Sequence, residues 1–187
     1  MRTFIAIALP QEMRDYLACI QAELKKCQAD VKWVQPENIH LTLKFLGERD
    51  EKKIEKIKEI LEETAREKAC FSLRLCNIGA FPKIDFPRII WAGIDAGEKE
   101  TEALALELEE RIAKIGIPKE DKPFSSHITI ARIKSPANRE GLVQGLKKIP
   151  QIQGKEFRVE KITLYKSTLT PKGPIYEVLK EANLKTI

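Results

Sequence analysis

The sequence His40-Leu41-Thr42-Leu43 recurs later in the chain as His127-Ile128-Thr129-Ile130. These two copies of a His-x-Thr-x frame contain both histidines of the 187-residue protein. Side chains two apart on a β-strand point to the same side. On a strand, each histidine therefore projects together with its threonine, while the leucine or isoleucine residues point into a core. Two such strands side by side would bring two imidazoles and two hydroxyls to one place.

The two frames are part of a longer internal repeat. His127 follows His40 by 87 positions, and Phe157 follows Phe71 by 86 positions at the start of two alternating segments. Segments with helical spacing of apolar residues lie between these landmarks in both halves. Each half is therefore interpreted as β-α-β-α-β, with chance spacing in an ordinary α+β domain as the alternative.

The periodicity predicts four helices and seven strands. The helices cover Met13–Cys27, Ile54–Thr64, Leu104–Ile115 and Leu142–Leu146. The strands cover Arg2–Leu9, Asn38–Leu46, Phe71–Phe81, Arg88–Asp95, Ser125–Ile133, Phe157–Ser167 and Pro174–Leu179.

The predicted fold class is α+β, with a single domain over residues 1–187. Two pseudo-symmetric lobes, approximately residues 1–85 and 86–187, are expected to place mainly antiparallel sheets against a central cleft. The turn residues near Ile84–Pro87 mark the expected boundary between the lobes.

The composition is that of a folded globular protein, because 43% of the residues are hydrophobic and 33% are charged. No apolar run approaches the length of a membrane span. A net charge of +5 is compatible with a polyanionic ligand but does not establish one. The four cysteines lack a C-x-x-C pair and are interpreted as reduced thiols of a cytoplasmic protein.

The paired frames and their flanks resemble the 2H phosphoesterase superfamily, and within it the RNA 2′,3′-cyclic phosphodiesterases historically called 2′-5′ RNA ligases. The matching segments are Arg2–Ile7, Asn38–Gly47 and Pro123–Arg132. The resemblance implies a bilobal α+β fold, and hydrolysis of a terminal 2′,3′-cyclic phosphate of RNA to a 2′-phosphate. It also implies that RNA ends can be joined through a 2′-5′ bond, and that no metal or nucleotide cofactor is needed.

The residue types suit this chemistry. Imidazole has an unperturbed pKa of about 6.5, so one neutral and one protonated histidine can coexist near neutral pH as a base and an acid. The resemblance assigns His40 as the proton donor to the leaving 3′ oxygen and His127 as the proton acceptor from water. Thr42 and Thr129 are expected to donate hydrogen bonds to the phosphate oxygens.

Two basic residues are further candidates for phosphate binding. The family places a basic residue near the phosphate at the position of Arg132, which simple alternation turns away from His127, so a bulge or the strand end is required. Lys44 has the same parity as His40 and Thr42 and is expected to face the phosphate with them. The same alternation predicts Phe45 as a core residue.

Other interpretations remain open from the residues alone. Strand histidines can have a purely structural role, and two histidines without nearby carboxylates or cysteines are an incomplete zinc site. The chain could also be a non-catalytic module that binds RNA ends, or an enzyme whose main task is ligation. The expected partner is RNA with a 2′,3′-cyclic phosphate end, with tRNA fragments as one source. No membrane partner is expected, and the chain is expected to be a monomer.

Overall fold

The computed structural model describes residues 1–149 and 155–186. Along the chain its elements are β1 (Arg2–Ala8), α1 (Gln11–Lys25), β2 (Val31–Trp33), a short 3-10 helix η1 (Pro36–Asn38), β3 (His40–Glu48), α2 (Glu51–Glu67), β4 (Phe71–Lys83), β5 (Phe86–Ile94), α3 (Glu98–Ala113), β6 (His127–Ile133), α4 (Arg139–Lys148), β7 (Glu156–Val159), β8 (Lys161–Thr170) and β9 (Gly173–Asn183). The four predicted helices are all present.

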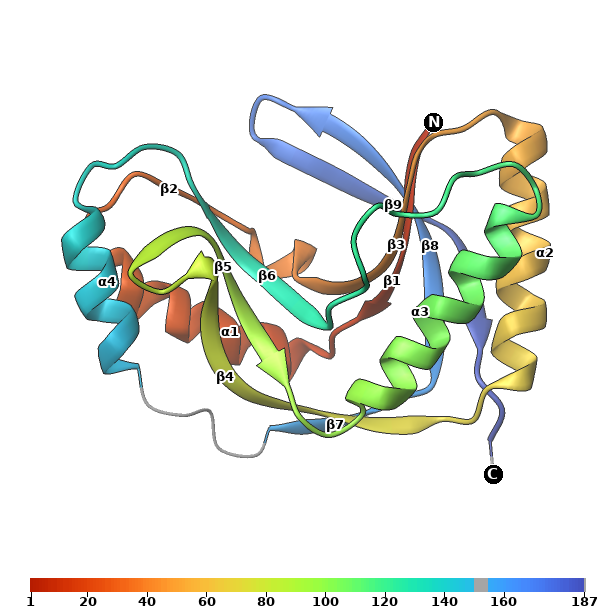
Figure 1. The fold of residues 1–187 in the computed structure, drawn as a ribbon, viewed down its shortest axis with the longest axis horizontal. Coiled ribbons are helices and arrows are strands. Elements are labelled where there is room, and N and C mark those ends of the chain that lie inside the picture. The colour runs from red at the N-terminus through yellow and green to blue at the C-terminus, as the bar shows by residue number, and fades with distance from the viewer. Residues whose placement is uncertain (150–154, 187) are drawn as a thin grey trace.

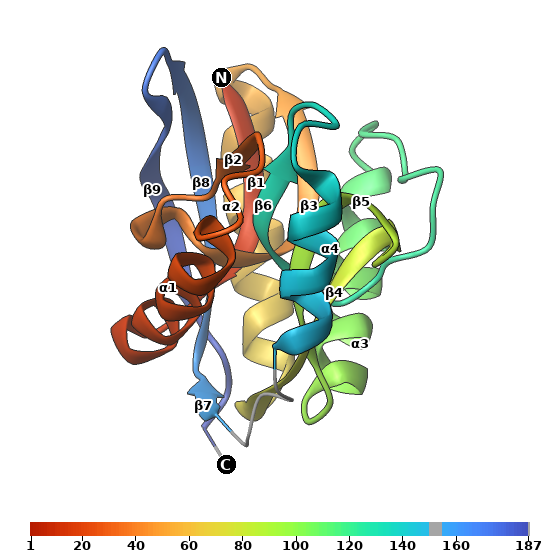
Figure 2. The same ribbon diagram turned by 90° about the vertical axis from the view of Figure 1, so that its left-hand side faces the viewer.

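The strands form two sheets (Figure 1). One sheet has the strand order β3-β1-β8-β9 and the other β2-β6-β5-β4-β7, and all pairs within them are antiparallel. Helices α2 and α3 contact the first sheet through β3, β8 and β9, whereas α1 and α4 contact each other beside the second (Figures 1 and 2). The predicted α+β class with antiparallel sheets is confirmed.

Each sheet takes strands from both halves of the chain. The boundary expected near Ile84–Pro87 lies in the turn between β4 and β5, which are neighbouring strands of one sheet. Likewise β8 pairs with β1 at the other end of the chain. The two sheets are therefore not built from consecutive halves of the chain. From the first half, β4 and α1 lie with β5 and β6, whereas β8 and α3 of the second half lie with β1 and β3.

The predicted strand Phe157–Ser167 is divided into β7 and β8 at Glu160. β7 joins β4, where Phe71 pairs with Val159 and Leu73 with Phe157, while β8 continues into the other sheet. The two pairs are reciprocal: the first residue of each repeat segment meets the third residue of the other. The repeats thus meet as two copies related by a twofold axis do.

Local signals explain where the helices form. Asp50 caps the start of helix α2, because its carboxylate accepts a hydrogen bond from the amide of Lys53 at 2.8 Å. Its residues Ile54, Ile57 and Leu61 recur at spacings of three and four and are almost fully buried against the sheet. Burial of each such side chain contributes about 1.5–3 kcal/mol. Over residues 1–149 and 155–186, no helix combines the length and apolar character that a membrane span requires.

Candidate active site

The two strands that carry the His-x-Thr-x frames contact each other where the sheets meet (Figure 1). Strand β3 begins at His40 and β6 begins at His127. The intervening residues Leu41 and Ile128 are completely buried, whereas both histidines and both threonines keep part of their surface accessible. The side-chain alternation predicted for the frames is therefore confirmed.

Both imidazoles are held in the same way by the backbone. Nδ1 of His40 lies 2.7 Å from the carbonyl oxygen of Asn38, and Nδ1 of His127 lies 2.7 Å from that of Ser125. A carbonyl oxygen only accepts, so Nδ1 carries the proton in both rings. In the neutral rings Nε2 is therefore the basic nitrogen, and in His40 it lies 2.9 Å from Oγ1 of Thr42. Each ring presents one nitrogen that can take up or release a proton.

Burial sets the protonation of both histidines. It lowers the pKa of His40 below 6.5, against the opposing effect of the hydrogen bond to Asn38. The pKa of His127 is also lowered, first by burial and further by the positive charge of Arg132, while the Ser125 carbonyl raises it. Both rings are thus biased towards the neutral form in the free protein.

Aromatic side chains surround the histidines. The ring of Phe4 stacks on His40 with centroids 4.8 Å apart, and the ring of Tyr176 meets His40 edge-on at 5.5 Å. At the other motif strand, the ring of Phe81 from β4 meets His127 edge-on, with ring centroids 5.1 Å apart. These three aromatic residues could not be assigned to the site from the sequence, because they lie far from the frames in the chain and reach them only through strand pairing.

A bulge at the same position of both frames changes the alternation after the threonine. On β6, Thr129 pairs with Trp91 and Arg132 with Ile89, so the extra residue returns Arg132 to the side of Thr129. On β3, Thr42 pairs with Ala6 and Phe45 with Phe4. The bulge that Arg132 required is present.

The bulge on β3 makes the expected orientations of Lys44 and Phe45 wrong. Lys44 pairs with Ile5 and points to the opposite side from His40, where only 1% of its side chain is exposed. Its ammonium group forms an ion pair with Glu109 of α3. Phe45 instead lies on the side of Thr42 and is 56% exposed, so it is not a core residue.

Glu109 connects Lys44 to the segment that leads to His127. The carboxylate of Glu109 also accepts a hydrogen bond from the amide of Glu120. Glu120 in turn accepts one from the amide of Phe45 at 3.3 Å. These bonds attach the loop that precedes β6 to β3. Lys44 is therefore part of a structural link between the two motif strands.

The charge of Arg132 reaches both sides of the site. Burial raises the pKa of Tyr176, and the guanidinium groups of Arg2 and Arg132 oppose this effect. Arg132 also lowers the pKa of His127. Because Tyr176 contacts His40, one positive charge acts on the surroundings of both histidines. A negatively charged group between the frames would be stabilised there.

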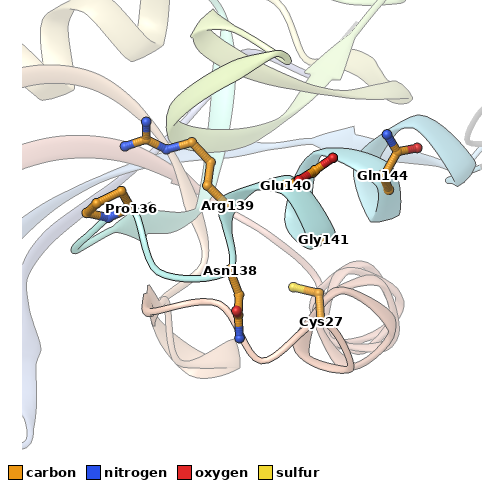
Figure 3. A pocket seen from close by; sticks show the side chains of 7 residues that line it. All are labelled: Cys27, Pro136, Asn138, Arg139, Glu140, Gly141 and Gln144. Carbon is orange, nitrogen blue, oxygen red and sulfur yellow. The ribbon is translucent and has the colours of Figure 1, made fainter.

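A cavity of about 310 Å³ adjoins His40. Its lining includes Asn38, Tyr165, Pro174 and Tyr176. A larger hollow lies on the surface at the start of α4, lined by Cys27, Pro136, Asn138, Arg139, Glu140, Gly141 and Gln144 (Figure 3). None of these residues belongs to β3 or β6, so the cavity beside His40 is the one relevant to the site. The part of the chain that the structure describes has no cluster of three or more His, Cys, Asp or Glu side chains suited to a metal ion.

The chain is similar to characterised sequences and structures over nearly its whole length. The family model for LigT-like phosphoesterases matches residues 7–91 and 94–176. The RNA 2′,3′-cyclic phosphodiesterase of Methanocaldococcus jannaschii is 39% identical over 181 residues, which cover 97% of this chain and 99% of that protein. The enzyme of the same name from Thermus thermophilus is 38% identical over 189 residues, with 99% and 91% covered.

Solved structures agree with the sequence relatives. The crystal structure of the Thermus thermophilus protein TT0787 superposes with a TM-score of 0.84 at 36% identity and covers 98% of both chains. Escherichia coli LigT, crystallised with 3′-AMP, superposes with a TM-score of 0.81 at 28% identity, with 98% of this chain and 97% of that chain covered. The resemblance inferred from the two His-x-Thr-x frames is confirmed: the chain belongs to the family of LigT-like phosphoesterases.

Proposed function

We propose that the protein hydrolyses the terminal 2′,3′-cyclic phosphate of RNA to a 2′-phosphate, by proton transfer between two histidines and without a metal ion. The observation that carries the proposal is the matched pair of imidazoles on contacting strands, each tied through Nδ1 to a carbonyl. Relatives that span nearly the whole chain carry the name of this activity.

In the proposed reaction, water attacks the phosphorus atom opposite the 3′ oxygen. Nε2 of His127 removes a proton from the water as the new P–O bond forms. Protonated His40 gives its Nε2 proton to the 3′ oxygen as the P–O3′ bond breaks, and the phosphate stays on the 2′ oxygen. With the 5′-hydroxyl of a second RNA in place of water, the same step would form a 2′-5′ bond.

The neighbouring residues stabilise the charge that develops on phosphorus. The hydroxyls of Thr42 and Thr129 donate to the non-bridging oxygens, because they lie on the same sides of their strands as the histidines. Arg132 neutralises the negative charge, in keeping with its effect on both His127 and Tyr176. Lys44 has no such role here, because it is buried against Glu109.

An assay with a defined RNA end tests the function. A short RNA ending in a 2′,3′-cyclic phosphate is incubated with the protein in EDTA, and the product is identified by ³¹P NMR. We expect a 2′-phosphate only, formed by the protein but not by a His127→Ala variant. An intact ring, or a 3′-phosphate as the only product, would contradict the proposal. Tight RNA binding without turnover would indicate a non-catalytic RNA-end-binding module.

The pH dependence of kcat/KM follows from the two lowered pKa values. The curve should be bell-shaped, because one ring must be neutral and the other protonated. Its maximum lies midway between the two apparent pKa values of the free enzyme, and both are below 6.5. We therefore expect a maximum below pH 6.5 and a fall in kcat/KM between pH 7 and 8.

Arg132→Gln removes a charge that lowers the pKa of His127, so the maximum should move to higher pH. Arg74→Gln is a matched control, because Arg74 pairs with Asp95 on the surface. A monotonic curve, a maximum above pH 7, or a downward movement in the Arg132 variant would contradict the assignment.

A further inference from the structure

One face of the β3-β1-β8-β9 sheet has exposed apolar side chains. Phe45 is 56% exposed, Leu169 is 65% exposed and Val178 is 55% exposed. Helices α2 and α3 lie on the other side of this sheet, and the β8–β9 hairpin extends away from them (Figure 1). Several large apolar side chains left exposed on one sheet face indicate an interaction surface.

Strand pairing places these side chains on the same face as His40. Phe4 pairs directly with both Phe45 and Tyr165, and directly paired residues point to the same side. On the hairpin the cross-strand pairs are Tyr165 with Val178, Ser167 with Tyr176 and Leu169 with Pro174, two residues apart on each strand. We call Phe45, Tyr165, Leu169, Tyr176 and Val178 the apolar face.

Phe4 makes the apolar face continuous with the active site. Its ring stacks on His40, and its centroid lies 5.2 Å from that of Tyr165 and 4.9 Å from that of Tyr176. It also lies 6.4 Å from Phe45. The aromatic surface therefore runs from the exposed ring of Phe45, past the catalytic imidazole, to the hairpin. A molecule bound at His40 that extends along the sheet would meet aromatic rings.

We propose that the apolar face binds the single-stranded nucleotides that precede the cyclic phosphate, by stacking their bases on its aromatic and apolar side chains. This proposal rests on the proposed function. A four-stranded sheet with exposed aromatic residues suits unpaired RNA bases, because every base has a π face. The guanidinium groups of Arg2 and Arg132 act on Tyr176 of this face and supply positive charge for the RNA backbone.

Base stacking on the apolar face would favour RNA whose 3′ end is unpaired. Bases in a duplex are already stacked on each other and cannot lie on protein rings. The preferred substrate is therefore an oligonucleotide with an unpaired 3′ end. A mononucleoside 2′,3′-cyclic phosphate lacks the preceding bases, and a blunt duplex end does not release them.

A substrate series tests the proposal without altering the protein. The values of kcat/KM are compared for a mononucleoside 2′,3′-cyclic phosphate, a single-stranded tetranucleotide with the same end, and the tetranucleotide with abasic sites at the preceding positions. Base stacking on aromatic residues leads us to expect the intact tetranucleotide to exceed the abasic one by about 5- to 100-fold. Equal values for the intact and abasic RNA would overturn the proposal.

Protein variants locate the effect on the sheet. Phe45→Ala should reduce the ratio of tetranucleotide to mononucleoside kcat/KM by about 3- to 30-fold. Val178→Ser should reduce the same ratio by a smaller factor, because valine offers apolar contact but no aromatic ring. Phe86→Ala and Leu106→Ser are matched controls, because these exposed apolar residues lie on β5 and α3. Both controls should leave the ratio unchanged. Circular dichroism verifies folding, and the abasic RNA keeps the test decisive if a variant does not fold.

The outcomes separate this proposal from the proposed function. If the unaltered protein opens neither substrate, the proposed function fails. If it opens the mononucleoside and the tetranucleotide with equal kcat/KM, the function stands and the stacking proposal fails. A native mass that rises with protein concentration, and no longer does so in Val178→Ser, would assign the face to a second copy of the chain and overturn RNA binding there.

Discussion

Replacement of either histidine by alanine should lower kcat for ring opening by about 10²- to 10⁴-fold, the usual contribution of a general acid or base. In the proposed mechanism, His40→Ala removes the proton donor to the 3′ oxygen, and His127→Ala removes the acceptor for the water proton. Initial rates with the cyclic-phosphate RNA measure both losses. The double variant should lose little more than either single variant, because residues that act as one unit are not additive.

Folding controls make this result interpretable. The Nδ1 of each ring bonds to a carbonyl, so circular dichroism and thermal unfolding should accompany every rate measurement. If a folded His40→Ala variant kept nearly full activity, His40 could not be the proton donor. Losses that multiply in the double variant would show that the two rings act independently.

Lys44→Met should reduce the free energy of unfolding by about 3–5 kcal/mol, as expected when one partner of a buried ion pair is removed. The substitution leaves the carboxylate of Glu109 without its cation, and only 17% of the Glu109 side chain is exposed. Urea denaturation of the variant and the unaltered protein measures the difference. Replacing both partners, as in Lys44→Met with Glu109→Leu, should recover part of the loss, because no buried charge then remains unpaired.

An exposed ion pair provides the matched control. Lys26 pairs with Glu23 on α1 with both side chains largely in solvent, so Lys26→Met should change the stability by less than about 1 kcal/mol. If Lys44 instead bound the phosphate, Lys44→Met would keep its stability and raise KM. That outcome would contradict the structural role.

The sequence was sufficient to predict the features that depend on short-range periodicity. Alternation placed Leu41 and Ile128 in the core and turned the histidines and threonines to the other side, and both placements are confirmed. Four helices followed from apolar spacing for the same reason. These features depend on which residues lie two, three or four positions apart, and the sequence contains that information directly.

Features that depend on long-range pairing were not predictable in this way. Lys44 and Phe45 were assigned to the wrong sides, because the bulge before them arises from the pairing of β3 with β1. A bulge on β6 also sets the side of Arg132, and there the sequence did indicate that a bulge was required. Phe4 and Tyr176 reach His40 from the two ends of the chain. The spacing of residues within a short segment does not indicate which distant residues will contact it.

The exchange of strands between the halves has a consequence for any attempt to divide the protein. A fragment that ends after Lys83 would contain β4 without β5, its neighbour in the sheet, and β1 without β8. Such a piece leaves open the edges of β1, β2 and β4 that pair with β8, β6, β5 and β7, and unpaired edges recruit other chains. One half of the chain could complete its sheets by pairing with strands of a second copy of itself, so such a fragment is expected to associate with other copies rather than to fold alone.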